Sequence, residues 1–286
     1  MGLYEKILVI TDFNDFSLNV CLKFSKYLFN DNSEVELLHV IEESGFISKL
    51  FSSRDEDLEN CVKARLPLVG KNISEIYGVD IKTNLRKGRI TKEINDFCQE
   101  NAIDLVIMAT ANVSDKSIGA NTHRLIRTAT VPLLVLSVDL DPRPIRNILI
   151  PIELYLSSRQ KVADAVAWAK HFGARITIIS GVWDSDKETK FKVKQISNNT
   201  KEFIESKGIE CELVMLDGLE TGKDFAEETV EYMNNPKNEV DIVMVMGRDE
   251  STEFSIDSRS QDVVRYAKIP VLCVPLRKTG MNARFL

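Results

Sequence analysis

The most constraining feature of this sequence is that its first half returns, in register, in its second half. The strand-like run Lys6-Ile7-Leu8-Val9-Ile10 reappears as Asn147-Ile148-Leu149-Ile150-Pro151, with Ile7 and Ile148 standing 141 positions apart. Ser17 and Ser158, which follow these runs, keep the same separation of 141. Solenoid repeats are far shorter, roughly 20 to 50 residues. The chain is therefore predicted to contain two copies of one domain.

A short segment from Asp139 to Pro144 marks the boundary between the copies. It holds two prolines among charged residues, a composition typical of an extended, solvated connection. A chain of 286 residues is long enough for two domains that each bury a core. We predict a first domain over residues 1–140 and a second over residues 145–286, close enough to touch.

Short apolar runs rich in β-branched residues alternate with longer amphipathic stretches in both copies. Such alternation predicts parallel strands joined by crossover helices, so the expected fold class is α/β, with two tandem doubly wound parallel-sheet domains. In the first copy we predict strands at 6–11, 34–41, 80–85, 103–109 and 132–137, and helices near 17–29, 55–77, 90–100 and 119–129. In the second we predict strands at 147–152, 175–181, 210–216, 240–246 and 271–274, and helices near 158–171, 187–207, 222–234 and 258–267.

Charge and cysteine content argue against several classes of function. The formal net charge is −6 without a long run of one sign, so no nucleic-acid partner is expected. The sequence has no signal-like leader and no apolar run of about 18 residues, so we expect no membrane contact and a cytoplasmic protein. The cysteines are scattered and lack CxxC spacing, which favours reduced thiols packed as small apolar side chains: Cys21, Cys61, Cys98, Cys211 and Cys273.

Ligands of doubly wound sheets bind beyond the carboxyl ends of the strands, where the strand order reverses. The turns after the first, second and fourth strands of each copy are therefore the segments in which to look for a site. They are 11–15, 40–43 and 109–120 in the first copy, and 152–155, 181–183 and 247–258 in the second.

These segments resemble the universal stress protein family. Lys6 to Asp12, with Ser17 behind it, is similar to that family's first strand and helix start, and Leu37 to Val40 is similar to its second strand. Residues 119–136, which include Val131-Pro132, are similar to its last helix and strand. The resemblance spans the whole chain as two copies. It implies a Rossmann-like fold of the adenine nucleotide alpha hydrolase type.

Nucleotide-binding members of this family carry Gly-x-x-Gly and, further on, Gly-Ser or Gly-Thr before a helix. Glycines let backbone N–H groups approach phosphates, and the helix N-terminus favours an anion. In the first copy only Gly119 fits this pattern. In the second, Gly247 and Ser258 hold the outer positions, but Glu250 and Asp257 replace the other glycines. Like charges at about 4 Å repel by on the order of 1 kcal/mol even in water, so we expect no ATP in the second copy.

The base and ribose side of the site is better preserved in the first copy. The resemblance implies that Asp12 lies near the ribose and adenine and that the main chain of Val40 faces the base. The second copy has Glu153 where the first has Asp12. Phe13 and Phe16 are large enough to fill the cavity, so the sequence leaves open whether Asp12 faces a ligand.

The loop of the first copy offers other groups that can bind an anion. Hydroxyls, amides and an ammonium can replace backbone contacts to phosphate, which makes Asn112, Lys116, Ser117 and Gly119 candidate ligands of a nucleotide or a smaller anion. Alternatively, the loop only caps the helix that begins near Gly119.

Two further segments are predicted to make contacts. The segment Gly45–Phe51 has four large apolar residues and no counterpart in the second copy, so it packs on its own domain or forms a lid or partner surface. The resemblance implies pairing through each domain's last strand, so Leu133–Ser137 and Val271–Val274 are expected to join as an internal pseudo-dimer. The proline before each strand fits an edge location. A homodimer of the tandem chain is compatible with the same resemblance.

These features favour a non-enzymatic stress-response protein that binds or regulates partners and whose ATP sites are degenerate. The alternative is a protein that binds ATP or AMP in the first copy and hydrolyses ATP weakly. A scaffold that acts through residues 46–51 is a third class. No catalytic residue or metal site is predicted, because the three histidines lack HxH or HExxH spacing.

Overall fold

The computed structural model describes residues 3–28, 33–42, 52–110, 119–154, 156–183, 186–247 and 258–277. Side chains are not described at 52–56, 58, 156–157, 219 and 258–259. The segment Phe46–Phe51 and the loop candidates Asn112, Lys116 and Ser117 lie outside the described residues.

Both halves alternate strands and helices as the sequence predicts. The first half contains β1 (Lys6–Ile10), α1 (Asp15–Ser25), β2 (Glu34–Glu42), α2 (Ser52–Tyr77), β3 (Ile81–Gly88), α3 (Ile90–Glu100), β4 (Leu105–Thr110), α4 (Ala120–Thr128) and β5 (Leu133–Ser137). The second contains β6 (Asn147–Pro151), η2 (Leu156–Arg159), α5 (Lys161–Phe172), β7 (Arg175–Val182), α6 (Lys187–Glu205), β8 (Cys211–Asp217), α7 (Gly218–Thr221), α8 (Phe225–Asn234), η3 (Pro236–Asn238), β9 (Ile242–Met246), α9 (Ser258–Tyr266) and β10 (Val271–Val274).

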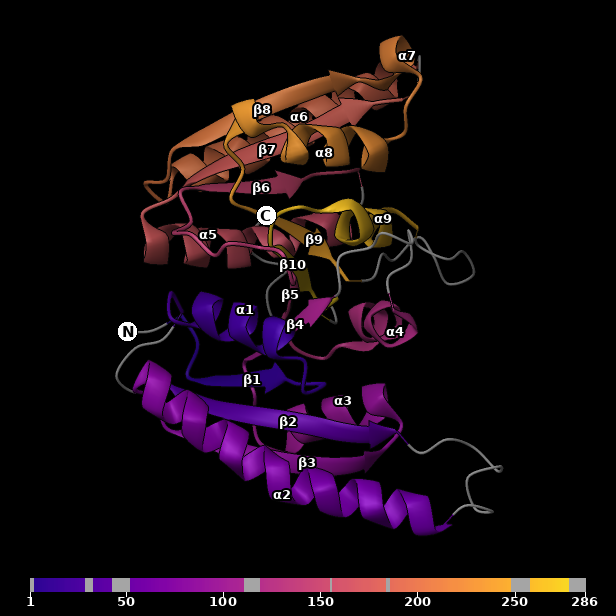
Figure 1. The fold of residues 1–286 in the computed structure, drawn as a ribbon. Coiled ribbons are helices and arrows are strands. Elements are labelled where there is room, and N and C mark those ends of the chain that lie inside the picture. The colour runs from indigo at the N-terminus through magenta and orange to yellow at the C-terminus, as the bar shows by residue number, and fades with distance from the viewer. Residues whose placement is uncertain are drawn as a thin grey trace.

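The strands form one sheet in the order β3-β2-β1-β4-β5-β10-β9-β6-β7-β8. Within each half the neighbours pair in parallel, and β5 pairs with β10 in antiparallel, with Leu134 opposite Leu272. Figure 1 shows the halves on either side of this junction. The predicted doubly wound α/β fold is confirmed, as is the predicted pairing of the two last strands. The edges of the halves thus become the interior of one sheet.

Two apolar layers lie on opposite faces of the sheet. Residues alternate between them along β1, since Ile7 and Val9 belong to one layer and Leu8 to the other. The first layer includes Phe24 of α1 and Trp168 of α5, so it extends across both halves. The second is covered by α3, α4, α8 and α9. This burial on both faces explains why the central strands are apolar throughout.

The helices after the first strands begin at different points from those predicted. The Asn14 side chain accepts the N–H groups of Phe16 (3.0 Å) and Ser17 (3.4 Å), so α1 begins at Asp15 and Ser17 lies inside its first turn. In the second half, the Ser158 hydroxyl donates to the Glu153 carbonyl (2.9 Å) within a 3-10 turn, and α5 begins only at Lys161. The two serines keep their sequence register without sharing the predicted role.

Candidate functional site

The turn after β1 places Asp12 at the carboxyl edge of the sheet. The Thr11 N–H continues the ladder to the Leu38 carbonyl (3.0 Å), and the Thr11 hydroxyl accepts the N–H of Phe13 (3.0 Å). Asp12 Oδ1 accepts the N–H of Asn14 (2.9 Å), and its side chain is exposed. The carboxylate is therefore held by its own turn and opens to solvent.

Phe13 forms the wall beside Asp12. Its backbone is left-handed, with φ of 62°, a conformation that few residues other than glycine adopt. Its ring packs on the His39 ring at 4.6 Å between centroids, and the Arg65 guanidinium lies 5.2 Å from the same ring. His39 Nδ1 lies 2.8 Å from the Thr11 carbonyl oxygen, which can only accept, so this nitrogen carries the hydrogen. The stack of Arg65, Phe13 and His39 fixes one side of the turn.

Val40 and Phe16 differ in their relation to this turn. Val40 is 7% exposed and stands beyond the last paired rung of β1 and β2, which is Ile10 with Leu38. Phe16 is 77% exposed on α1. Of the two aromatic residues that could fill the cavity, only Phe13 packs inward.

The second half repeats this arrangement with different residues. Because β1 pairs Ile10 with Leu38 and β6 pairs Pro151 with Ile179, the counterparts of His39 and Val40 are Ser180 and Gly181. The Ser180 hydroxyl donates to the Ile152 carbonyl (2.8 Å), just as His39 donates to the Thr11 carbonyl. The hydrogen bond is kept while the imidazole is lost.

Trp183 covers the counterpart of Val40. A Cβ at Gly181 would lie 2.4 Å from the indole ring, and one at Gly218 would lie 1.9 Å from the indole nitrogen. The indole N–H donates to the Lys223 carbonyl, and the ring packs on Phe225 at 5.1 Å. The second half thus fills this position with its own side chain.

The candidate glycines serve different purposes. Gly119 is the N-cap of α4, with φ of −53°, and a Cβ there would come no closer than 4.0 Å to Thr122. Gly247 donates its N–H to the Val274 carbonyl (2.8 Å), and a Cβ there would lie 2.5 Å from the carbonyl oxygen of Ile126 in α4. The missing side chain of Gly247 is therefore explained by packing between the halves. Ser258 opens α9, and its side chain is not described.

Residues 3–137 match the sequence profile of the Universal stress protein family. This half of the chain is therefore similar to the universal stress protein family over nearly its whole length. A universal stress protein of Methanocaldococcus jannaschii is 28% identical over 141 residues, which are 47% of this chain and 82% of that protein.

Comparison of structures extends the likeness to the second half. A universal stress protein from Archaeoglobus fulgidus covers 98% of this chain, and 98% of its own length, at 16% identity and a TM-score of 0.75. This likeness confirms the universal stress protein fold for the full chain. A universal stress protein solved in complex with cAMP covers 49% of this chain, and all of its own length, at 14% identity and a TM-score of 0.38. The bound cAMP is a finding about that protein.

Two contacts that shape these turns are not predicted from the sequence. They are Arg65 over the Phe13 ring and Trp183 over Gly181. Trp183 carried a signal, because an aromatic residue stands two positions after a glycine at the end of a buried strand. A missing side chain there leaves room for a ring.

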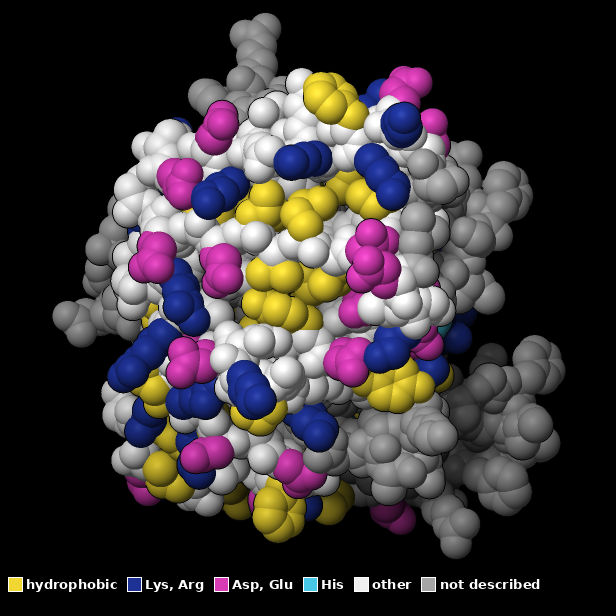
Figure 2. Space-filling view, turned by 90° about the horizontal axis from the view of Figure 1, so that it is seen from above, with side chains coloured by type: hydrophobic (Ala, Val, Ile, Leu, Met, Phe, Trp, Pro, Cys, Tyr) yellow, Lys and Arg dark blue, Asp and Glu magenta, His cyan; other side chains and the backbone are white. Residues whose placement is uncertain are grey.

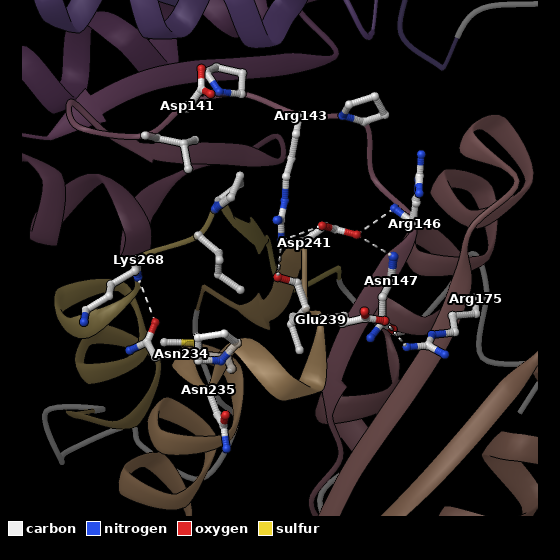
Figure 3. Close-up of a pocket in the computed structure, with 18 of the residues that line it drawn as sticks. Asp141, Arg143, Arg146, Asn147, Arg175, Asn234, Asn235, Glu239, Asp241 and Lys268 are labelled. Atoms are coloured by element: carbon white, nitrogen blue, oxygen red, sulfur yellow. Dashed lines mark hydrogen bonds and ion pairs between the residues drawn. The ribbon is translucent and has the colours of Figure 1, made fainter.

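A separate hollow of about 1040 Å³ lies at the opposite, amino edge of the second half. The segment 140–147 lines it, together with residues that precede β7, β9 and β10. Figure 3 shows Arg143 reaching from that segment to Asp241, 2.8 Å away. Asp241 also accepts backbone N–H groups, and Arg175 lies 3.6 Å from Glu239. Acidic and basic side chains line the hollow in equal number, and two ion pairs join them, so the hollow seats the connecting segment without an excess of either charge.

The described part of the chain holds neither a cluster of metal-ligating side chains nor a membrane-spanning helix. It contains no group of three or more His, Cys, Asp or Glu side chains placed to hold a metal ion. No helix within it is long and apolar enough to cross a membrane. Burial raises the pKa of the Cys21 thiol, with a smaller contribution from the Asp12 carboxylate, so this thiol beside the turn stays protonated and unreactive.

Proposed function

We propose that this chain is a non-enzymatic stress-response protein of the cytoplasm that acts by binding, and that its nucleotide sites are degenerate. Two domains, 1–140 and 145–286, would carry these sites. The observation that supports the proposal is the indole of Trp183 over Gly181, the counterpart of Val40. A base cannot occupy space that a packed ring already fills. In the first domain, Gly119 alone remains of the phosphate-binding pattern.

A second candidate is a protein that binds ATP or AMP in the first domain and hydrolyses ATP weakly. The exposed carboxylate of Asp12 beside the Phe13–His39 pair favours it, because an adenine ring can stack on an aromatic surface. The strained backbone of Phe13 points the same way, since strain of this kind concentrates at functional sites. Asn112, Lys116 and Ser117 would then hold the phosphates.

Titration calorimetry with ATP, AMP and cyclic AMP separates the two candidates, with mass spectrometry of anything that co-purifies. If the sites are degenerate, we expect no saturable heat of binding at millimolar nucleotide and no co-purified nucleotide. The second candidate expects one site per chain, lost in Asp12→Ala and kept in Glu153→Ala, the matched change in the second domain. Retained circular dichroism would show that both variants fold.

A protein partner is the remaining part of the proposal. If no nucleotide binds, the chain is expected to act through protein surfaces, and Phe46 and Phe51 are the candidates that the sequence offers. Replacing both by serine should abolish partner capture while leaving the melting temperature unchanged. Loss of folding would instead mean that the segment packs on its own domain.

A further inference from the structure

The two outer strands of the sheet differ in how they are protected. β3 carries Lys82, Arg86 and Lys87, and Lys82 lies 2.9 Å from Glu34. Charged side chains of this kind prevent an edge strand from pairing with another chain. In contrast, β8 contains the apolar run Leu213–Leu216. Within the part of the chain that the structure describes, no strand covers its outer side.

Among the described residues, none forms a main-chain ladder with the outer edge of β8, and apolar side chains lie along this edge. The Ile176 N–H donates to the Glu210 carbonyl (2.9 Å), so in a parallel ladder alternate residues from Glu210 onward face β7. The N–H and C=O groups of Leu213 and Met215 therefore face outward. Met215 is 40% exposed, and Figure 2 shows an apolar strip across this face between charged side chains.

We propose that two copies of this chain associate through β8, by antiparallel pairing of β8 with β8 of the second copy. A register centred on Val214 places the outward-facing Leu213 opposite Met215, as an antiparallel ladder requires. Apolar residues then meet apolar residues at the centre. Glu212 lies opposite Leu216, and Asp217 lies opposite Cys211, so no like charges are directly opposed.

The charges of the other outer strand are already paired within its own half. Lys82 lies 2.9 Å from Glu34, Arg86 lies 2.5 Å from Glu100 and Lys87 lies 3.2 Å from Glu59. β3 therefore presents ion-paired side chains where β8 presents apolar ones.

The chain already contains a junction of the proposed kind. β5 and β10 pair in antiparallel, with Val135 opposite Val271, while helices cover both faces of the sheet. A β8 pairing would repeat this arrangement at the end of the second half and continue the sheet into the second copy. Stable interfaces bury about 1,200 to 2,000 Å² in total, more than one strand pair supplies, so α6 must contribute and the dimer should dissociate on dilution.

Sedimentation velocity of the full chain over a range of concentrations tests this proposal. The wild-type chain is expected to form dimers, and Met215→Lys is expected to weaken dimerisation at least tenfold. The control is Ile76→Lys, because Ile76 is also an exposed apolar side chain, at 71%, but lies on α2 in the first half. This control should dimerise like the wild type. A monomeric wild-type chain, a dimeric Met215→Lys variant or equal loss in the control would overturn the proposal.

Cross-linking tests the register independently of stability. Val214 faces itself at a non-hydrogen-bonded position, where Cα atoms lie about 4.5 Å apart, within reach of a disulfide. With the exposed Cys61 replaced by serine, Val214→Cys should form a covalent dimer on oxidation. Met215→Cys faces Leu213 and should not. The register is wrong if both variants cross-link equally or if neither does.

Discussion

Asp241 holds the start of β6 in the same way that Asp104 holds the start of β1. The Asp104 carboxylate accepts the N–H of Lys6 at 2.9 Å, and the Asp241 carboxylate accepts the N–H of Asn147 at 2.9 Å. Each also accepts the N–H of the residue before. Arg143 adds a further contact to Asp241, 2.8 Å away. One carboxylate therefore ties the first and fourth strands together in each half.

The two carboxylates should contribute unequally to stability. Asp241→Ala leaves N–H groups without a partner where the side chain is only 9% exposed, whereas the groups around Asp104 reach water. A buried unpaired donor costs about 1–3 kcal/mol, so we expect Asp241→Ala to lower the free energy of unfolding by about 3 kcal/mol and Asp104→Ala by about 1 kcal/mol. Urea unfolding measures both. Arg143→Ala, whose side chain is 63% exposed, should cost less than about 1 kcal/mol.

Trp183→Ala should destabilise the second half. Large-to-small changes at core aromatic residues cost about 3–5 kcal/mol, and the half-buried indole should cost about 2–3 kcal/mol. Trp183→Phe, which loses the hydrogen bond to Lys223 but keeps a ring, should cost less. Chemical denaturation compares the variants. An unchanged midpoint in Trp183→Ala would mean that the indole does not pack on Gly181 in solution.

Gly247→Ala should weaken the junction between the halves. Its Cβ would lie 2.5 Å from the Ile126 carbonyl oxygen, so backbone must shift at a cost of about 1–3 kcal/mol. Gly119→Ala is the matched control, because a Cβ there meets nothing closer than 4.0 Å. Thermal unfolding should show a lower melting temperature for Gly247→Ala alone. Equal loss in both variants would point away from the junction.

Asp164 should make stability depend on pH at the acid end. Burial raises the pKa of this carboxyl above 3.8, against the opposing effect of Arg277 at 2.8 Å. A raised pKa in the folded state means that its stabilising effect is complete below pH 3.8 and is lost as pH rises through the folded pKa. Asp164→Asn should therefore gain stability relative to wild type as pH increases from 3.8. A relative loss would show that the ion pair with Arg277 outweighs the burial.

Repetition, hydrophobic patterning and turn composition were enough to predict the fold. The apolar strands and amphipathic helices could be predicted without the tertiary structure. A continuous apolar run such as Leu105 to Met108 indicates a strand that is buried on both faces. The helix starts were predicted less well. Asn14 competes with Ser17 for the capping role, and local sequence does not rank the two.

The site depended more on tertiary structure. The sequence located the turns and offered Asp12, Val40 and Gly119 as candidates, whereas their surroundings come from residues far away in the chain. Arg65 reaches Phe13 from α2, and Ile126 explains Gly247 from the other half. Packing between segments that are distant in sequence leaves no periodic signal.

The sequence by itself determined the repeat and the α/β class, because both follow from local order and spacing, and it carried the resemblance to the universal stress protein family. Only the tertiary structure decided how the halves differ. It placed Trp183 over Gly181 and left Asp12 exposed beside Phe13, although both turns occupy the same register. The physical reason is that side-chain volume and contact direction, rather than residue type, determine whether a position at the sheet edge is filled or open.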